Sequence, residues 1–173
     1  ADVTLIMGPT QLAFSANGIN LVNVTTADEM YSACIDKFKE ADITIMSAAV
    51  ADYTPINKAD EKIKKKEGSL NVELTKTKDI LKALGEKKKK GQILVGFALE
   101  TNNEEAFANQ KLKEKNADLI VLNSLNDTGA GFGYDTNKIT IFERGGKVYK
   151  FETKSKSEVA KDIIDTITQL YYA

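Results

Sequence analysis

Four lysines and one aspartate follow the end of an apolar run in the first third of the chain. The run from Ile43 to Val50 ends two residues before Asp52, and Lys62 opens a group of four lysines within five residues. An aspartate accepts hydrogen bonds from a ribose or helps to hold a metal ion, and a lysine meets the charge of a phosphate group. The pattern suits a nucleotide site, although a charge run such as "KKKEG" is by itself more typical of a solvated turn.

Two further segments place polar residues where an apolar run ends. In "GFALETNN" Phe97 is either a core residue or a ring that stacks on a base, and Glu100 lies near the start of the next helix. An acidic residue there complements the helix dipole or binds a metal ion or a ribose. On that helix Lys111 and Lys115 lie one turn apart, which alone is a surface pattern. In "GAGFGYD" the spacing G-x-G-x-G does not match the dinucleotide fingerprint and favours a flap or a turn.

The composition narrows the chemistry. The chain contains no histidine, which excludes Ser-His triads, histidine acid–base catalysis and nearly all zinc sites. Its one cysteine, Cys34, falls on the apolar stripe of an expected helix, which predicts a buried structural thiol, and a single cysteine suits a reducing cytoplasm. The net charge of −1 argues against a general nucleic-acid binder, and no apolar run is long enough to span a membrane.

Strand-like runs alternate with helical patterns along the chain. The expected strands are residues 3–7, 19–24, 43–50, 70–75, 93–99 and 117–123, followed by a hairpin over 138–151. The expected helices are residues 27–39 with Thr26 as N-cap, 79–86, 103–115, and a last helix that begins at the capping box Ser155-x-x-Glu158. This alternation predicts an α/β fold with a Rossmann-like, largely parallel sheet, helices on both faces and a C-terminal β-hairpin.

The expected sheet determines where a ligand would bind. The run from Ile43 to Val50 has no polar alternation, which predicts a strand covered on both faces. In open α/β sheets, ligands bind outside the carboxyl ends of the strands. This rule selects three loops, which follow Val50, Leu99 and Asn123.

Several motifs, in order, resemble one known family. The motifs are "AAVADY", "EKIKK", "GFALETNN", "NQKLKEKNADLIVLN" and "GAGFGYDTNKITI". Together they are similar to bacterial phosphopantothenoylcysteine synthetase, also called phosphopantothenate–cysteine ligase, over essentially the whole chain. In most bacteria this ligase is the carboxyl-terminal half of a bifunctional coenzyme A biosynthesis protein whose other half is a flavin-dependent decarboxylase.

The resemblance implies a ligase with 4′-phosphopantothenate, cysteine and CTP as substrates and Mg²⁺ as cofactor. In the family, the pantothenate carboxylate attacks the α-phosphate of CTP, and the cysteine amine then displaces CMP from the acyl-cytidylate. By matching position, Lys62 is the catalytic lysine and also contacts the nucleotide. The other nucleotide-binding residues implied by the resemblance are Met46, Ser47, Ala48, Asp52, Thr77, Lys78, Asp79, Ile80, Phe97, Lys111 and Lys115. The metal ligands are not identified by the resemblance.

Two departures from the family pattern bear on the site. Thr77-Lys78 stands where relatives often carry Asn-Pro. The family's amino-terminal motifs, a Gly-Pro-Thr turn after the first strand and a Ser-Gly-Lys helix start, are unmatched, because "MGPTQLAF" is a later segment. We therefore expect residues 1–173 to form a single nucleotide-binding ligase domain without the family's N-terminal strand and helix, and to bind CTP weakly on their own.

The resemblance also carries expectations about assembly. It implies a homodimer, and the hairpin over 138–151 has alternating apolar residues, among them Ile139 and Ile141, which a lone domain would have to cover. It implies a cytoplasmic enzyme, fused to the decarboxylase in the full-length protein, without a nucleic-acid or membrane partner. A nicotinamide dehydrogenase is disfavoured because no G-x-G-x-x-G motif follows a strand, whereas a non-catalytic nucleotide-binding module remains an alternative. The choice between CTP and ATP also stays open.

Overall fold

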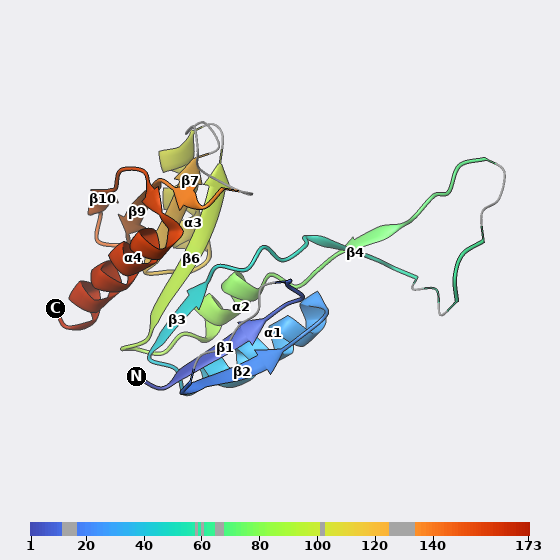
Figure 1. The fold of residues 1–173 in the computed structure, drawn as a ribbon, viewed down its shortest axis with the longest axis horizontal. Helices are drawn as coiled ribbons and strands as arrows, with labels where there is room; N and C mark the ends of the chain where they lie inside the picture. Colours follow the sequence, from blue (N-terminus) through green and yellow to red (C-terminus); the bar gives the residue numbers. More distant parts are fainter. Residues whose placement is uncertain (12–16, 58, 60, 65–67, 101–102, 125–133) are drawn as a thin grey trace. The chain divides into compact units, whose positions relative to one another are not determined.

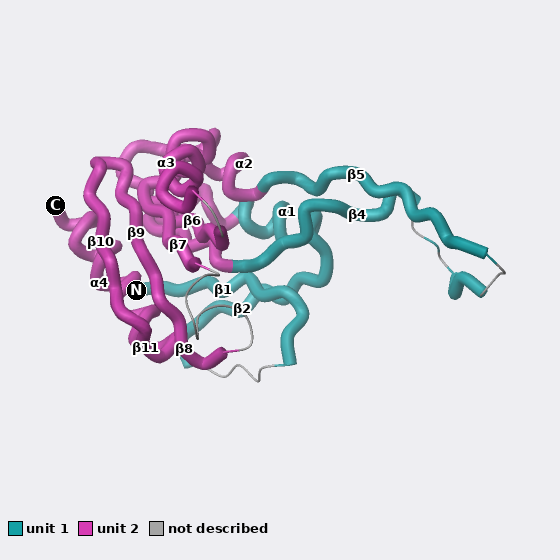
Figure 2. Tube along the Cα trace, turned by 90° about the horizontal axis from the view of Figure 1, so that it is seen from above, with its two compact units in different colours: residues 1–36, 48–79 teal, residues 37–47, 80–173 magenta. Residues whose placement is uncertain are grey.

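The fold was analysed in a computed structural model that describes residues 1–11, 17–57, 59, 61–64, 68–100, 103–124 and 134–173. The chain divides into two compact units (Figure 2). Unit 1 consists of residues 1–36 and 48–79, and unit 2 consists of residues 37–47 and 80–173. The expectation of a single domain stays a prediction.

Unit 1 combines a short parallel sheet, most of one helix and an antiparallel hairpin. Its elements are β1 (Val3–Met7), β2 (Ile19–Asn23), α1 (Ala27–Phe38), β4 (Tyr53–Pro55) and β5 (Leu74–Lys76). Strands β1 and β2 are parallel, and β4 pairs with β5 in antiparallel orientation. Helix α1 begins at a reciprocal cap, in which Thr26 Oγ1 accepts from the Glu29 amide and the Glu29 carboxylate accepts from the Thr26 amide. The predicted N-cap at Thr26 is confirmed.

Unit 2 is built on a five-stranded sheet in the order β10-β9-β7-β6-β3 (Figure 1). Its elements are β3 (Ile43–Met46), α2 (Ile80–Lys87), β6 (Ile93–Glu100), α3 (Glu104–Glu114), β7 (Leu119–Ser124), β8 (Thr136–Asn137), β9 (Ile139–Glu143), β10 (Val148–Lys150), β11 (Lys154–Ser155) and α4 (Lys156–Tyr171). Strands β3, β6 and β7 are parallel, whereas β9 and β10 are antiparallel to their neighbours. Strands β8 and β11 form a separate antiparallel pair.

Helices cover both faces of this sheet because the side chains of each strand alternate between the faces. On one face, α4 contributes Val159, Ile163 and Ile167 to a core with residues of β6, β7 and β9. On the other face, Ala108 and Leu112 of α3 pack against Ile120 and Leu122 of β7. The predicted α/β class, with a largely parallel sheet, helices on both faces and a C-terminal hairpin, is confirmed.

Local capping and a lone thiol behave as the sequence predicts. Helix α4 begins at a capping box in which the side chains and backbone amides of Ser155 and Glu158 bond reciprocally. The hydrogen bond from Ser155 holds the pKa of the Glu158 carboxyl below its usual range.

Cys34 is buried on the apolar face of α1, and burial raises the pKa of its thiol, as expected of a structural cysteine.

Three expectations about strands are wrong. Strand β3 ends at Met46 instead of Val50, and its Ile43 and Ile45 are more than one third exposed, so it is not covered on both faces in the described part of the chain. The expected strand over 70–75 is reduced to β5, which has a partner, β4, that the sequence pattern did not predict. Ile139 and Ile141 are at most 1% exposed, because α4 already covers that face of the hairpin. The argument that they need a partner chain therefore fails.

Candidate functional site

In unit 1, the hairpin β4–β5 brings together two segments that the resemblance assigns to nucleotide binding. Asp52 immediately precedes β4 and Thr77 immediately follows β5, and the ladder pairs Tyr53 with Lys76. The Thr77 amide donates to the Asp52 carbonyl oxygen at 2.9 Å, and the Thr77 hydroxyl donates to the Ala51 carbonyl oxygen at 2.7 Å. These residues are neighbours in space because of the hairpin, although 25 positions separate them in sequence.

Lys78, where relatives often carry proline, is used for contacts inside unit 1. Its ammonium lies 3.2 Å from a carboxylate oxygen of Asp28 and 4.9 Å from the ring centroid of Tyr31, both on α1. The side chains of the ion pair are well exposed, so the pair itself adds little stability. The next residue, Asp79, is exposed, and Ile80 is only 5% exposed, so Ile80 can offer a ligand its backbone but not its side chain.

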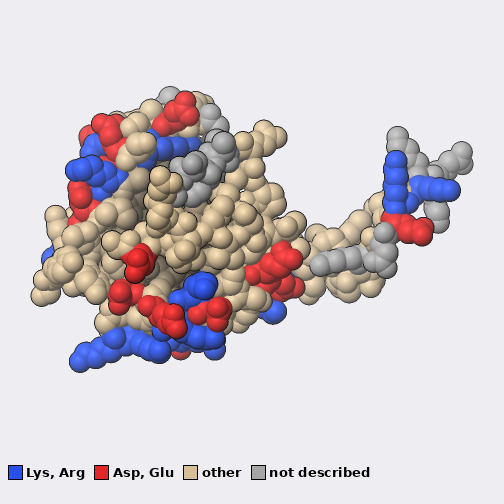
Figure 3. Space-filling model, turned by 60° about the horizontal axis from the view of Figure 1, so that its bottom comes forward, with Lys and Arg blue, Asp and Glu red and all other residues tan. Residues whose placement is uncertain are grey.

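The candidate catalytic lysine lies on the loop between β4 and β5. Lys62 is exposed, and no hydrogen bond or ion pair joins it to another residue within the described ranges. Basic and acidic side chains gather at the far end of this hairpin (Figure 3). The loop therefore offers a cation to solvent, which is the property that a phosphate-binding lysine needs. Part of the same loop, residues 65–67, lies outside the described residues.

In unit 2, a lysine of α3 reaches the carboxyl-terminal half of β6. The Lys111 ammonium donates to the Phe97 carbonyl oxygen at 2.8 Å. The Phe97 side chain packs against the core under α4, whereas Lys111 approaches from α3 on the opposite face. Phe97 is thus partly buried against the core, and a stacking role stays a prediction. A nucleotide that used both residues would have to bind across the end of β6.

Other predicted contacts lie at the end of β3 and at the end of α3. Met46 pairs with Gly96 beside Phe97 and is half-buried, and Ser47 and Ala48 follow it as exposed residues. Lys115 is the C-cap of α3, one turn beyond Lys111, with a half-buried side chain. Lys62 belongs to unit 1 and the lysines of α3 belong to unit 2. Their convergence on one triphosphate stays a prediction.

Two polar pairs at the carboxyl end of β7 were missed from the sequence. The Ser124 hydroxyl donates to the Glu104 carboxylate in the first turn of α3. The Asn137 side-chain amide donates to the Asn123 side-chain oxygen at 3.1 Å, which joins β8 to β7. Ser124 and Asn137 are each only 9% exposed. A signal was available for one partner of each pair, because Asn123 and Ser124 end an apolar run at the edge where ligands bind.

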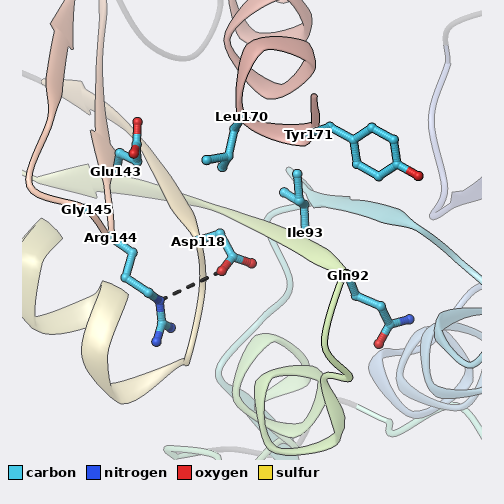
Figure 4. Close-up of a pocket in the computed structure, with 9 residues that line it drawn as sticks. Gln92, Ile93, Asp118, Glu143, Arg144, Gly145, Leu170 and Tyr171 are labelled. Atoms are coloured by element: carbon cyan, nitrogen blue, oxygen red, sulfur yellow. Dashed lines mark ion pairs between the residues drawn. The ribbon is translucent and has the colours of Figure 1, made fainter. Parts of the chain in front are cut away.

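A cavity of about 480 Å³ lies at the opposite edge of the sheet, where β6 and β7 begin (Figure 4). It is lined by Gly91, Gln92, Ile93, Asp118, Glu143, Arg144, Gly145, Leu170 and Tyr171. The Asp118 carboxylate already accepts from Lys88 at 2.6 Å and from the Leu94 amide at 2.8 Å. The Gln92 side-chain amide donates to two backbone carbonyl oxygens. These polar groups hold the fold together, so we do not place the nucleotide there.

The described residues offer neither a metal cluster nor a membrane-spanning helix. Within the residues that the structure describes, no group of three or more acidic or cysteine side chains is arranged to hold a metal ion. Across the same ranges, every helix is too short or too polar to cross a bilayer. In the third predicted loop, the three glycines of "GAGFGYD" lie outside the described residues. Only Tyr134 and Asp135 of that motif are described.

Comparison with known proteins supports the resemblance. A protein of an unknown prokaryotic organism, named cysteine/cysteine sulfinic acid decarboxylase, is 51% identical over 99% of this chain and 48% of its own length. The coenzyme A biosynthesis bifunctional protein CoaBC of Bacillus subtilis (strain 168) is 45% identical over 98% of this chain and 42% of its own length. This chain thus spans about half, or less, of these curated relatives.

A solved structure and a family model agree with these relatives. The crystal structure of the C-terminal domain of a CoaBC protein has a TM-score of 0.80 and 38% identity, covering 98% of this chain and 74% of the solved one. The model of the DNA/pantothenate metabolism flavoprotein C-terminal domain matches residues 1–171. The chain therefore belongs to the family of DNA/pantothenate metabolism flavoprotein C-terminal domains.

Proposed function

We propose that this domain joins 4′-phosphopantothenate to cysteine in coenzyme A biosynthesis, with CTP as the activating nucleotide. The family match over residues 1–171 carries this proposal, together with the 45% identity to a protein named for coenzyme A biosynthesis. The geometry supports it, because predicted nucleotide-binding residues meet in pairs, Asp52 with Thr77 and Phe97 with Lys111. The residue roles below are part of the proposal.

The first step activates the carboxylate. A carboxylate oxygen of 4′-phosphopantothenate attacks the α-phosphorus of CTP, the bond from that phosphorus to the bridging oxygen breaks, and pyrophosphate leaves. Negative charge develops on the α-phosphate oxygens in the transition state. An ammonium group beside those oxygens stabilises that charge, which is the role of Lys62. Lys62 is suited to it because its side chain is exposed on the loop between β4 and β5.

The second step makes the amide. The amine nitrogen of cysteine attacks the acyl carbon, the carbon–oxygen bond to the cytidylate breaks, and CMP leaves with that oxygen. The amine loses one proton as the amide forms. Lys111 and Lys115 meet the phosphate charge of the nucleotide in this proposal, and Phe97, with the chain from Met46 to Ala48, borders the base and ribose. Asp52 accepts hydrogen bonds from the ribose or helps to hold a cation.

Mg²⁺ fits this site as a companion of the triphosphate. Proteins commonly bind Mg²⁺ through one or two carboxylates together with substrate phosphates, rather than in a cage of protein ligands. The described residues agree with that mode, since they form no cluster of three metal-binding side chains and Asp52 presents an exposed carboxylate. When bound, Mg²⁺ would neutralise phosphate charge during nucleotidyl transfer.

The test is a coupled assay of pyrophosphate release with CTP, phosphopantothenate and cysteine. It is run on this chain and on a chimera that adds the preceding residues of the Bacillus subtilis relative, because this chain spans 42% of that protein. We expect the chimera to release pyrophosphate only when phosphopantothenate is present, and this chain alone to be much slower. Equal rates would show that the added residues are dispensable. No phosphopantothenate-dependent release from either protein would refute the ligase, and faster release with ATP would refute CTP.

The name of the relative with 51% identity suggests a second candidate activity, decarboxylation of cysteine or cysteine sulfinic acid. The chain matches only 48% of that protein, so the activity in its name need not reside in the matched half. Carbon dioxide release from either amino acid, without a nucleotide, distinguishes it from the ligase. The alternative of a non-catalytic nucleotide-binding module predicts CTP binding without release of pyrophosphate or carbon dioxide.

We further propose a cytoplasmic homodimer, fused in the full-length protein to a flavin-dependent decarboxylase domain. The exposed apolar side chains of the β4–β5 hairpin support a dimer. Six large apolar side chains there are more than half exposed: Tyr53, Ile56, Ile63, Leu70, Val72 and Leu74. Exposed apolar residues so close together are typical of surfaces that another chain covers.

The dimer gives a direct prediction. Light scattering should report about twice the 19.0 kDa mass of one chain, and Leu70→Glu with Val72→Glu should shift the protein to the mass of one chain. Ile164→Glu is the matched control, because Ile164 is similarly exposed but lies on α4, in the other unit. A monomer mass at every concentration, or a hairpin variant that stays dimeric, would contradict the proposal.

A further inference from the structure

The two hydrogen bonds from Thr77 hold the backbone on both sides of a single Cα atom. The hydroxyl binds the carbonyl oxygen of Ala51, which belongs to the peptide plane that precedes the Asp52 Cα. The amide binds the carbonyl oxygen of Asp52, which belongs to the peptide plane that follows it. Because peptide units are planar, φ and ψ of Asp52 set the direction of its Cα–Cβ bond relative to the two neighbouring peptide planes. Thr77 therefore anchors both planes whose orientation defines those two angles.

Lys78 connects this arrangement to the rest of unit 1. Directly after Thr77, it reaches Asp28 and the ring of Tyr31 on α1. Asp52 is exposed, and within the described ranges its carboxylate has no hydrogen-bond or ion-pair partner to set its direction. The backbone at Asp52 therefore determines where this side chain projects from the chain, and Thr77 is the residue across the hairpin that holds that backbone.

We propose that Thr77 is a positioning residue that aims the Asp52 carboxylate, rather than a direct ligand of the nucleotide through its side chain. The hydroxyl proton of Thr77 is already donated to Ala51, which leaves only the weaker acceptor function of that oxygen for a ligand. The consequence for catalysis rests on the proposed ligase function. The two hydrogen bonds that hold the backbone do not depend on that function, so the backbone contact and the catalytic consequence can be tested separately.

The first test needs no substrate. Thr77→Val keeps the branched shape and removes the hydroxyl, Thr77→Ser keeps the hydroxyl, and Thr75→Val is the control on the exposed strand β5. Amide hydrogen exchange is measured at position 77 in the chain without nucleotide. We expect exchange about tenfold faster in Thr77→Val, as for the loss of one neutral hydrogen bond, and near wild-type exchange in the serine and control variants. Unchanged exchange in Thr77→Val would show that the Thr77 hydroxyl does not hold the backbone around Asp52, an arrangement called the backbone lock below.

The second test asks whether Thr77 acts through Asp52. In the active protein, Thr77→Val should raise the KM for CTP about tenfold with a smaller change in kcat, and Thr77→Ser should restore it. The same substitution is then made in an Asp52→Ala background, where it should have no further effect, since coupled residues are non-additive. An effect of equal size in both backgrounds would mean that Thr77 contacts the nucleotide directly, and the proposal would be wrong.

The outcomes separate the two levels of inference. A wild-type protein that releases no pyrophosphate, but shows the expected exchange pattern, refutes the ligase and leaves the backbone lock standing. An active protein whose Thr77→Val variant binds CTP normally refutes the positioning role and leaves the ligase standing. Unfolding temperatures of all variants are measured alongside, so that a general loss of structure is recognised.

Discussion

Lys62→Gln should slow pyrophosphate release by a hundredfold or more without unfolding the protein. The proposed step concentrates charge on the α-phosphate, and removing one preorganised group that stabilises such charge typically costs about a hundredfold to a thousandfold in rate. Lys62 is exposed and has no partner within the described part of the chain, so its loss should change the free energy of unfolding by less than about 0.5 kcal/mol. Single-turnover pyrophosphate release and thermal unfolding measure the two effects.

Lys64→Gln is the matched control for that experiment. Lys64 lies on the same loop, is equally exposed, and has the same charge. A general effect of the positive loop on nucleotide attraction would lower the rate in both variants by similar factors and would weaken with added salt. A specific transition-state role predicts a large loss only in Lys62→Gln. Near wild-type release by Lys62→Gln would assign the catalytic charge to another residue.

Gly85→Ala should lower the free energy of unfolding by about 3 kcal/mol. A Cβ atom at this position of α2 would lie 1.8 Å from the carbonyl oxygen and 2.8 Å from the carbonyl carbon of Lys115, at the end of α3. Inside a helix, Gly→Ala normally stabilises by about 1 kcal/mol, but here the neighbour is backbone and cannot rotate away. Overpacking of this kind commonly costs about 1–3 kcal/mol, and the severity of this contact places it at the upper end.

Urea unfolding of Gly85→Ala, with Glu86→Ala as control, measures this effect. Glu86 is the adjacent, exposed residue of α2, so its substitution should change stability little. Asn116→Gly separates the role of the neighbouring hydrogen bond, because Asn116 donates to the Gly85 carbonyl oxygen and has a φ of 49°, which glycine adopts freely. If Gly85→Ala were as stable as the wild type, α2 and α3 would not pack as closely as described.

The same contact connects stability to the candidate site. Lys115 provides the carbonyl oxygen against which Gly85 packs, and its side chain is one of the predicted phosphate contacts. Displacing this end of α3 would move that side chain, and also Lys111 one turn earlier. A Gly85 variant that still folds should therefore bind CTP less tightly than the wild type, even under conditions where both proteins are fully folded.

Periodicity and capping were sufficient to predict most elements from the sequence. Strand β1 agrees at both ends, and the N-cap Thr26 and the capping box at Ser155 begin α1 and α4 as expected. These features depend on residues three or four positions apart, so the local sequence contains nearly all the information. Cys34 was likewise predicted to be buried from its place on the apolar face of one helix.

The partners of individual site residues could not be predicted in the same way. The motifs identified Asp52, Thr77, Phe97 and Lys111 as candidates, but not that Thr77 would bind the backbone beside Asp52 or that Lys111 would bind the Phe97 carbonyl oxygen. Each of these contacts joins residues at least 14 positions apart. Chain connectivity, and not propensity, brings them together.

The hairpins show where sequence pattern and tertiary structure separate. Alternation in the run from Ile139 to Glu143 correctly predicts a strand, but it does not say which surface covers Ile139 and Ile141, and α4 of the same chain does so. Strand β4 has only three residues, too few for a periodic signal, and forms because β5 lies beside it. The sequence by itself determined the family, the order of the main helices and strands, and the candidate residues, because motifs, caps and periodicity are local. Only the tertiary structure decided which faces are covered and which side chains meet, because those contacts depend on how distant segments pack.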